Sequence, residues 1–206
     1  MRTLTSLILA PALLFAASAL AQPPKPARTQ TVVVAGGCFW GVEAVYEHMR
    51  GVKKVVSGYA GGDSTSASYG KVSTGRTGHA ESVQITFDPQ EVTYGDILRV
   101  FFSVAHDPTQ LNRQGPDTGP QYRSAIFYTN EAERDLARSY IADLDKSGKF
   151  SRAIVTRVDP LKGFYPAEEY HQDYIAQNPH NPYVVFNDLP KIRALKRLYP
   201  EYYREP

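Results

Sequence analysis

The stretch TVVVAGGCFWGVEAVYE, residues 31–47, decides how the chain begins to fold and where its chemistry could lie. Its first five residues are apolar and mostly β-branched, which favours a short buried strand over residues 31–35. A helical pattern follows, and we expect a helix over residues 38–49. The only cysteine of the chain, Cys38, lies at the junction between the two elements, directly after two glycines.

The position of this cysteine favours a reactive thiol. A residue at the start of a helix faces unpaired backbone N–H groups and the positive end of the helix dipole, which lower the pKa of a thiol. Gly36 and Gly37 allow a tight turn that leaves the sulfur accessible, and Phe39 and Trp40 place aromatic rings beside it. A lone cysteine is more often a small buried apolar residue, but this context indicates that Cys38 is a nucleophile.

The first residues have the pattern of a secretory signal peptide. A positive start is followed by an apolar run over residues 7–15, and Ala19-Leu20-Ala21 fits the small-x-small cleavage pattern. We therefore expect residues 1–21 to be a signal peptide, residues 22–30 to be a proline-rich leader and residues 31–206 to be a single domain. The apolar run is too short for a stable membrane span, so the domain is expected to be exported, in a bacterium to the periplasm.

Charge and cysteine content exclude several partners and crosslinks. The chain has 23 Lys and Arg against 21 Asp and Glu, a net charge of +2, so its composition does not call for nucleic acid or an acidic membrane surface. With one cysteine, no disulfide can form within the chain. No heptad pattern or long apolar patch indicates an assembly, and a monomer is expected.

The rest of the chain alternates strands and helices. A second strand is expected over residues 52–59 and a third, with clean alternation of apolar residues, over residues 82–87. Thr93 and Asp96 form a capping box at the start of the next helix. The order β-α-β-β-α-β with extra elements indicates an α+β fold, a split β-α-β (ferredoxin-like) sandwich with helices packed on a mixed sheet. Further expected elements are strands over residues 122–128 and 153–158, a helix capped by Asn130 and Glu133 with Leu136, Tyr140 and Leu144 facing inward, a short helix opened by Pro166, a helix over residues 191–199, and an otherwise irregular C-terminal segment.

Two long loops, residues 58–81 and 106–121, hold most of the polar residues that could act with a thiol. His79 and Glu81 are two residues apart at the start of a strand, so their side chains could face one site. On the residues alone, three kinds of site stay open. They are a cysteine hydrolase with His79 or His106 as base, a metal site of His79, Glu81 and His106, and an aromatic binding pocket without catalysis.

Several short motifs occur in an order typical of one enzyme family. They are GCFWG at residues 37–41, GYAGG at 58–62, GHAE at 78–81, HDPT at 106–109, QYRS at 121–124 and AEEYHQ at 167–172. With these motifs, the chain from residue 32 to residue 177 resembles peptide methionine sulfoxide reductase A. The resemblance implies that residues 31–206 are a single catalytic domain that reduces the S epimer of methionine sulfoxide, free or within oxidised proteins.

The resemblance also implies residue roles that agree with the chemistry of a sulfoxide. Cys38 would be the nucleophile, and Phe39 and Trp40 would line the pocket for the S-methyl group. Glu81 would protonate the sulfoxide oxygen, without which the sulfur is a poor electrophile. A carboxyl group stays protonated near neutral pH when it is desolvated, for instance against Trp40.

The resemblance implies three more roles, and the chain departs from the family pattern at two points. Tyr69 and Tyr122 would donate hydrogen bonds to the sulfoxide oxygen, and Asp117 would help to hold the site together. The family usually has asparagine before this aspartate; here the residue is Pro116, and a different local backbone is expected. Many relatives carry further cysteines near the C-terminus, and this chain has none. We therefore expect an external thiol to reduce the sulfenic acid of Cys38, from a thioredoxin-like or glutaredoxin-like partner or a small thiol, without a metal or another cofactor.

Overall fold

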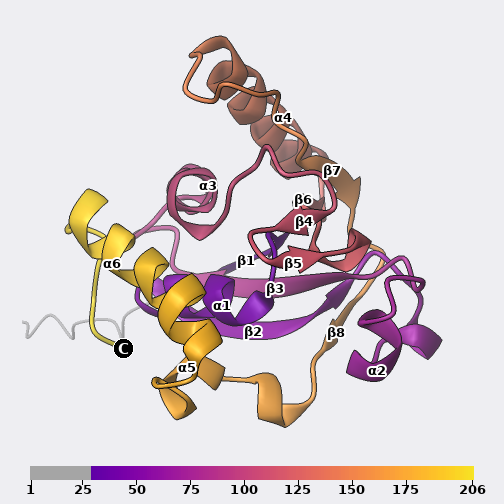
Figure 1. The fold of residues 1–206 in the computed structure, drawn as a ribbon. Helices are drawn as coiled ribbons and strands as arrows, with labels where there is room; N and C mark the ends of the chain where they lie inside the picture. The colour runs from indigo at the N-terminus through magenta and orange to yellow at the C-terminus, as the bar shows by residue number, and fades with distance from the viewer. Residues whose placement is uncertain (1–28) are drawn as a thin grey trace, which may run out of the picture.

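The computed structural model describes residues 29–206, in which a mixed six-stranded sheet packs against helices (Figure 1). The strand order is β7-β6-β1-β3-β2-β8. The strands are β1 (Gln30–Ala35), β2 (Val52–Ala60), β3 (Ala80–Phe87), β6 (Ala125–Tyr128), β7 (Arg157–Pro160) and β8 (Phe164–Pro166), with a separate hairpin of β4 (Arg113–Gln114) and β5 (Asp117–Thr118). The helices are α1 (Phe39–Glu47), α2 (Tyr69–Val72), α3 (Tyr94–Val100), α4 (Glu131–Lys146), α5 (Tyr174–Gln177) and α6 (Leu189–Leu198). The expected signal peptide and nearly all of the expected leader lie outside the described residues.

The centre of the sheet has the expected split β-α-β arrangement. Strands β1 and β2 both pair antiparallel with β3, which lies between them, so β1 and β2 run parallel to each other and α1 connects them. Strand β6 pairs antiparallel with the free side of β1. The four central strands therefore have the order β6-β1-β3-β2, which confirms the predicted fold class.

Alternation along β1 separates two apolar clusters. Val32 and Val34 join the large cluster that includes α1 and α3, whereas Val33 and Ala35 join a smaller cluster on the opposite face of the sheet. Each valine that is fully buried in this way contributes roughly 1.5 to 3 kcal/mol of transfer free energy. Helix α3 begins with the predicted capping box of Thr93 and Asp96. These contacts fix the end of β1 and the start of α1 relative to the sheet.

The C-terminal segment lies against α1 and is more helical than expected. Helix α5, a π-helical turn at Val184–Asp188 and α6 all contact α1, as the orange and yellow ribbon in Figure 1 shows. The predicted helix over residues 191–199 is confirmed as α6, which begins two residues earlier. Within residues 29–206, no helix combines the length and the apolar composition needed to cross a bilayer.

Two predicted strands begin later than expected, for separate reasons. Strand β6 begins at Ala125 because Pro120 opens a 3₁₀ turn that ends at Tyr122. Strand β7 begins at Arg157 because the chain before it is bound to a loop, with the Val155 N–H donating to the Pro108 carbonyl at 2.9 Å.

Two other predictions were wrong in detail. Pro166 does not open a helix; it ends β8, where it pairs with Gly58 at the outer edge of the sheet. An edge strand tolerates proline, because its outward-facing N–H has no partner to lose. Leu136 of α4 is 41% exposed, while Ala137 is fully buried and Tyr140 and Leu144 pack against the core. The prediction is therefore confirmed for Tyr140 and Leu144 and wrong for Leu136, whose place in the apolar stripe Ala137 takes.

Candidate active site

Cys38 lies in a turn that only small residues can form. It is the N-cap residue of α1, and two glycines separate it from the end of β1. Gly37 has a φ of +91°, a conformation that favours glycine. A Cβ on Gly36 would lie 2.9 Å from Cγ of His106, so that position has no room for a side chain. The two glycines therefore bring the sulfur to the first turn of the helix, where 8% of the residue is exposed.

Glu81 lies beside this turn. It belongs to β3, which pairs with β1, and it is 2% exposed. The Phe39 N–H, an unpaired donor of the first turn of α1, donates to Oε2 of Glu81 at 3.2 Å. Burial raises the pKa of the Glu81 carboxyl to about 8; the Phe39 N–H opposes this shift and the nearby Asp117 adds to it. The group next to Cys38 is therefore a neutral carboxylic acid at neutral pH.

The pKa of Cys38 differs from the expectation. The sequence predicted a lowered pKa at the helix start, but burial raises the pKa of the thiol well above its usual value, and Glu81 and Asp188 raise it further. The Trp40 backbone N–H and the Lys191 ammonium lower it by less. The helix terminus thus acts in the predicted direction, but desolvation outweighs it. In the resting site the sulfur is a thiol.

Aromatic side chains surround the sulfur on one side. Phe39 is almost fully buried, with its ring centroid 5.1 Å from that of His171. Trp40 is only partly buried and stacks on Tyr174 at 3.7 Å with an angle of 6° between the planes. The Trp40 ring also meets Tyr183 edge-on at 5.9 Å. Of the two aromatic residues that follow Cys38, Trp40 is therefore the accessible one, whereas Phe39 is buried, and both rings lie near His171.

The two predicted hydroxyl donors have their pKa values shifted by the same groups. Tyr69 begins α2, and its backbone N–H donates to Oε1 of Glu168 at 2.9 Å. Tyr122 ends the turn that precedes β6. Burial raises the pKa of both phenols, and Glu81 and Cys38 raise them further, so both hydroxyls keep their protons. This shared influence is consistent with two hydroxyls directed to the region between Cys38 and Glu81.

Asp117 reaches the site from the β4–β5 hairpin. Gly115 and Pro116 form the turn of this hairpin, with a φ of +55° at the glycine. The Tyr183 hydroxyl donates to Oδ2 of Asp117, and the pKa of this carboxyl is raised by burial, with the Tyr183 hydrogen bond opposing the shift. The chain with Pro116 therefore forms a regular hairpin that still brings the carboxyl to the site.

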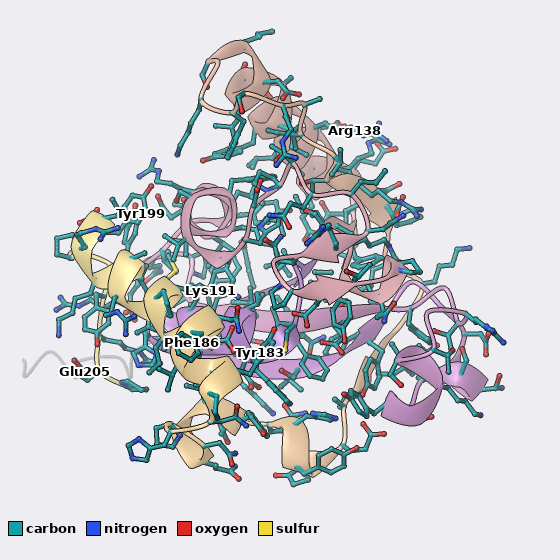
Figure 2. The ribbon with its side chains drawn as sticks, viewed as in Figure 1. Arg138, Tyr183, Phe186, Lys191, Tyr199 and Glu205 are labelled. Carbon is teal, nitrogen blue, oxygen red and sulfur yellow. The ribbon has the colours of Figure 1, made fainter. Side chains whose placement is uncertain are left out.

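Several residues at the site were not found from the sequence. Nε1 of Trp40 donates to Nδ1 of His171 at 3.2 Å, and Tyr183 bonds Asp117 from the C-terminal segment. Figure 2 shows Tyr183 and Lys191 on that segment, which contacts α1. Of these residues, only His171 lies in a motif that the sequence analysis identified, AEEYHQ. Tyr183 lies in a stretch without periodicity, and the predicted helix that holds Lys191 gave no sign that it packs against α1.

The histidines considered as bases or metal ligands are occupied elsewhere. His79 accepts from the Gly62 N–H at Nδ1, and its Nε2 lies 2.9 Å from the Asp63 carbonyl. Nδ1 of His106 forms a hydrogen bond with the Phe101 carbonyl and Nε2 forms one with the Ser124 hydroxyl. Burial lowers the pKa of His106 to about 4. Both rings therefore hold loops in place, and neither is free to act as base or metal ligand for Cys38. Within residues 29–206, no three or more His, Cys, Asp or Glu side chains are grouped so as to hold a metal ion.

Known proteins similar to this chain share one described activity. A family model described as peptide methionine sulfoxide reductase matches residues 30–202. A relative from Mesorhizobium japonicum, described as peptide methionine sulfoxide reductase MsrA 2, is 57% identical over 177 residues, which are 86% of this chain and 91% of the relative.

Solved structures agree with this match. The reduced form of Mxr1 from Saccharomyces cerevisiae has a TM-score of 0.70 and 35% sequence identity, over 76% of this chain and 90% of that chain. Another structure holds Mxr1 in complex with Trx2, with a TM-score of 0.51 and 26% identity over 75% of this chain and 90% of that chain. Because the family model spans most of the sequence and the matches extend to the fold, the chain belongs to the peptide methionine sulfoxide reductase family.

Proposed function

We propose a role for each site residue in the reaction that this enzyme performs, the reduction of methionine S-sulfoxide to methionine, free or in oxidised proteins. In this proposal Cys38 is the nucleophile and Glu81 is the general acid. One observation supports both assignments most directly: the buried carboxyl of Glu81 accepts the Phe39 N–H next to the only cysteine. A nucleophilic sulfur and a neutral acid are thus held together at one helix terminus.

In the chemical step Cys38 acts as a thiolate and Glu81 as the proton donor. The Cys38 thiolate attacks the sulfoxide sulfur while Glu81 gives its proton to the sulfoxide oxygen. The attack forms a bond between the two sulfurs and makes the sulfoxide oxygen a hydroxyl. That S–S bond and the S–O bond of the substrate then break as the hydroxyl moves to Cys38, so methionine leaves and Cys38 becomes a sulfenic acid. Sulfur is reduced in the substrate and oxidised in the enzyme. Glu81 is left as a carboxylate, which burial then favours to regain a proton.

The remaining residues support this step. The hydroxyls of Tyr69 and Tyr122 donate to the oxygen as it gains negative charge. Trp40 provides an accessible apolar surface for the S-methyl group, whereas Phe39 is buried. Asp117, oriented by the hydrogen bond from Tyr183, keeps the β4–β5 hairpin against the site.

An external thiol completes the cycle. The chain has a single cysteine, so no second thiol of its own can attack the sulfenic acid. A thiol RSH forms a mixed disulfide with Cys38 and releases water; a second thiol then releases Cys38 as a thiolate and leaves a disulfide of the reductant. The structure of Mxr1 with Trx2 supports a thioredoxin as this partner, and a glutaredoxin or a small thiol could supply the same chemistry.

A substrate assay separates the proposal from its alternatives. The protein is incubated with each epimer of methionine sulfoxide, free and within a peptide, with dithiothreitol as reductant. We expect methionine from the S epimer only, in both forms. A cysteine hydrolase would instead cleave an ester or peptide bond, and a binding module would give no thiol-dependent product. Equal reduction of the R epimer would contradict the proposed specificity.

We also propose that the enzyme works outside the cytoplasm, in a bacterium in the periplasm, where it repairs oxidised proteins. The support is the sequence pattern of residues 1–21, which resembles a signal peptide. Sequencing of the mature N-terminus after expression of the full chain in a bacterium is expected to give Gln22 as the first residue, in the periplasmic fraction. A protein that keeps Met1 and stays in the cytoplasmic fraction would contradict this localisation.

A further inference from the structure

A buried ion pair from the C-terminal segment lies against the first turn of α1. Asp188, the last residue of the π-helical turn, is fully buried, and Nζ of Lys191 in α6 lies 3.1 Å from its Oδ1. The Lys191 side chain is 18% exposed. A buried ion pair is costly to desolvate and seldom adds to stability by itself. Its place next to the reactive turn therefore calls for another explanation.

The Asp188–Lys191 ion pair packs closely against the first turn of α1. A Cβ on Gly41, three residues after Cys38, would lie 2.1 Å from Oδ1 of Asp188 and 2.6 Å from Nζ of Lys191. The ion pair thus fills the space that a side chain on the first turn would occupy. Oδ2 of Asp188 is buried and has no hydrogen-bond partner within residues 29–206, so a structural network does not account for the carboxylate.

Lys191 differs from the other ionisable groups that act on Cys38 in the sign of its charge. The groups that act on the sulfur are Glu81 from β3, the phenols of Tyr69, Tyr122 and Tyr183, and the pair Asp188 and Lys191, while Asp117 from β5 acts on Glu81 and Asp188. All of them except Lys191 are acids. The ammonium lowers the pKa values of Cys38, Asp117 and Asp188. Among these groups it is the one that favours a thiolate by its charge.

We propose that Lys191 is a positioning residue for the Cys38 sulfur: Asp188 holds the Lys191 ammonium beside the first turn of α1, where its positive charge offsets the Asp188 carboxylate and favours the thiolate. The inference rests on the proposed function, because that cycle forms the thiolate twice. It forms once before the attack on the sulfoxide. It forms again when the mixed disulfide is cleaved, as the attacking thiolate of the reductant forms a new S–S bond and Cys38 leaves with the electron pair of the old one.

The test measures the thiolate directly. The rate at which iodoacetamide alkylates Cys38 is followed as a function of pH in the full chain, where no other thiol competes. Asp188→Asn is expected to lower the pKa of Cys38 relative to the unmodified protein, because the ammonium then acts without its neighbouring negative charge. In that background, adding Lys191→Met is expected to raise the pKa again, with roughly a twofold or greater loss of thiolate at a given pH below the pKa.

The comparison within the Asp188→Asn background separates this role from a structural one. A structural ion pair is already broken by Asp188→Asn, so adding Lys191→Met would not change the thiol further. The matched control is Lys196→Met in the same background, since Lys196 is on the same helix but exposed and paired with Glu205. It is expected to leave the pKa unchanged.

Two further measurements complete the test. Lys191→Arg, which preserves the charge, is expected to keep the pKa of the unmodified protein. If the double variant does not fold, as judged by circular dichroism, Lys191→Met alone decides, with Lys196→Met as its control, because an unchanged or lower pKa overturns the proposal. Equal alkylation profiles for Asp188→Asn with and without Lys191→Met also overturn it. Failure of the proposed function would appear elsewhere, as sulfoxide reduction by a protein without Cys38.

Discussion

Replacing Cys38 by serine is expected to lower the rate of methionine sulfoxide reduction by at least about 10³-fold. The reason is chemical, because a serine oxygen cannot accept the oxygen atom of the sulfoxide as sulfur does. The fold should not be affected, since Cys38 is the N-cap residue of α1 and serine is among the preferred residues at that position. The measurement is the rate with dithiothreitol, together with circular dichroism of the variant.

The product of one turnover provides the matching positive result. Mass spectrometry of the unmodified enzyme, reacted with one equivalent of methionine S-sulfoxide and without reductant, is expected to show one added oxygen on Cys38. The enzyme without Cys38 should show none. Reduction at an undiminished rate by the serine variant would mean that another group receives the oxygen, and the proposed cycle would be wrong.

Local sequence patterns were sufficient to predict the centre of this site. The strand, the glycine turn and the helix start around Cys38 are encoded within residues 31–47, and the alternation of β3 places Glu81 next to them. These elements pair in the order that the β-α-β-β-α-β pattern predicts. The prediction held because each of these elements is determined by its own apolar pattern, even though long loops connect β2 to β3 and α3 to β6.

Tertiary contacts explain what could not be predicted. The helix start suggested a low pKa for Cys38, but the net direction depends on burial and on Asp188, which is far away in the sequence. Tyr183 reaches the site from a segment rich in proline and tyrosine that has no clear period, and Lys191 from a helix that was predicted but could not be placed next to α1. Likewise, Pro166 could be assigned to β8 only once the outer edge of β2 was known.

Glu81→Gln is expected to lower the rate of the sulfoxide step by about 10²- to 10⁴-fold at neutral pH, the usual contribution of a general acid. The amide can still accept the Phe39 N–H, so the first turn of α1 keeps its partner. It cannot transfer a proton to the sulfoxide oxygen. The measurement is single-turnover formation of methionine with enzyme in excess, which isolates this step from the later reduction of Cys38.

The pH dependence identifies the acid more sharply than the rate alone. Below about pH 8 both Glu81 and Cys38 hold protons, because the pKa of Glu81 is about 8 and that of the thiol is higher still. In the active form Cys38 is a thiolate and Glu81 keeps its proton, so the pair has lost one of its two protons. The rate therefore rises as pH approaches about 8, where the first proton leaves the pair, and falls at higher pH when the second leaves. In Glu81→Gln only the thiol titrates, so the rate should rise with thiolate formation and then stay level.

Glu43→Gln is the matched control for this prediction. Glu43 is also 2% exposed, and burial raises its pKa to about 8, but its carboxyl accepts the Ser57 N–H. If the decrease in rate at high pH could come from any buried carboxyl, Glu43→Gln would abolish that decrease as well. We expect Glu43→Gln to keep both the rate of the unmodified protein and its decrease at high pH. A Glu81→Gln enzyme that still slows at high pH would assign the proton donor to another group. Since Tyr69 and Tyr122 keep their protons to still higher pH, that outcome would point to one of the phenols.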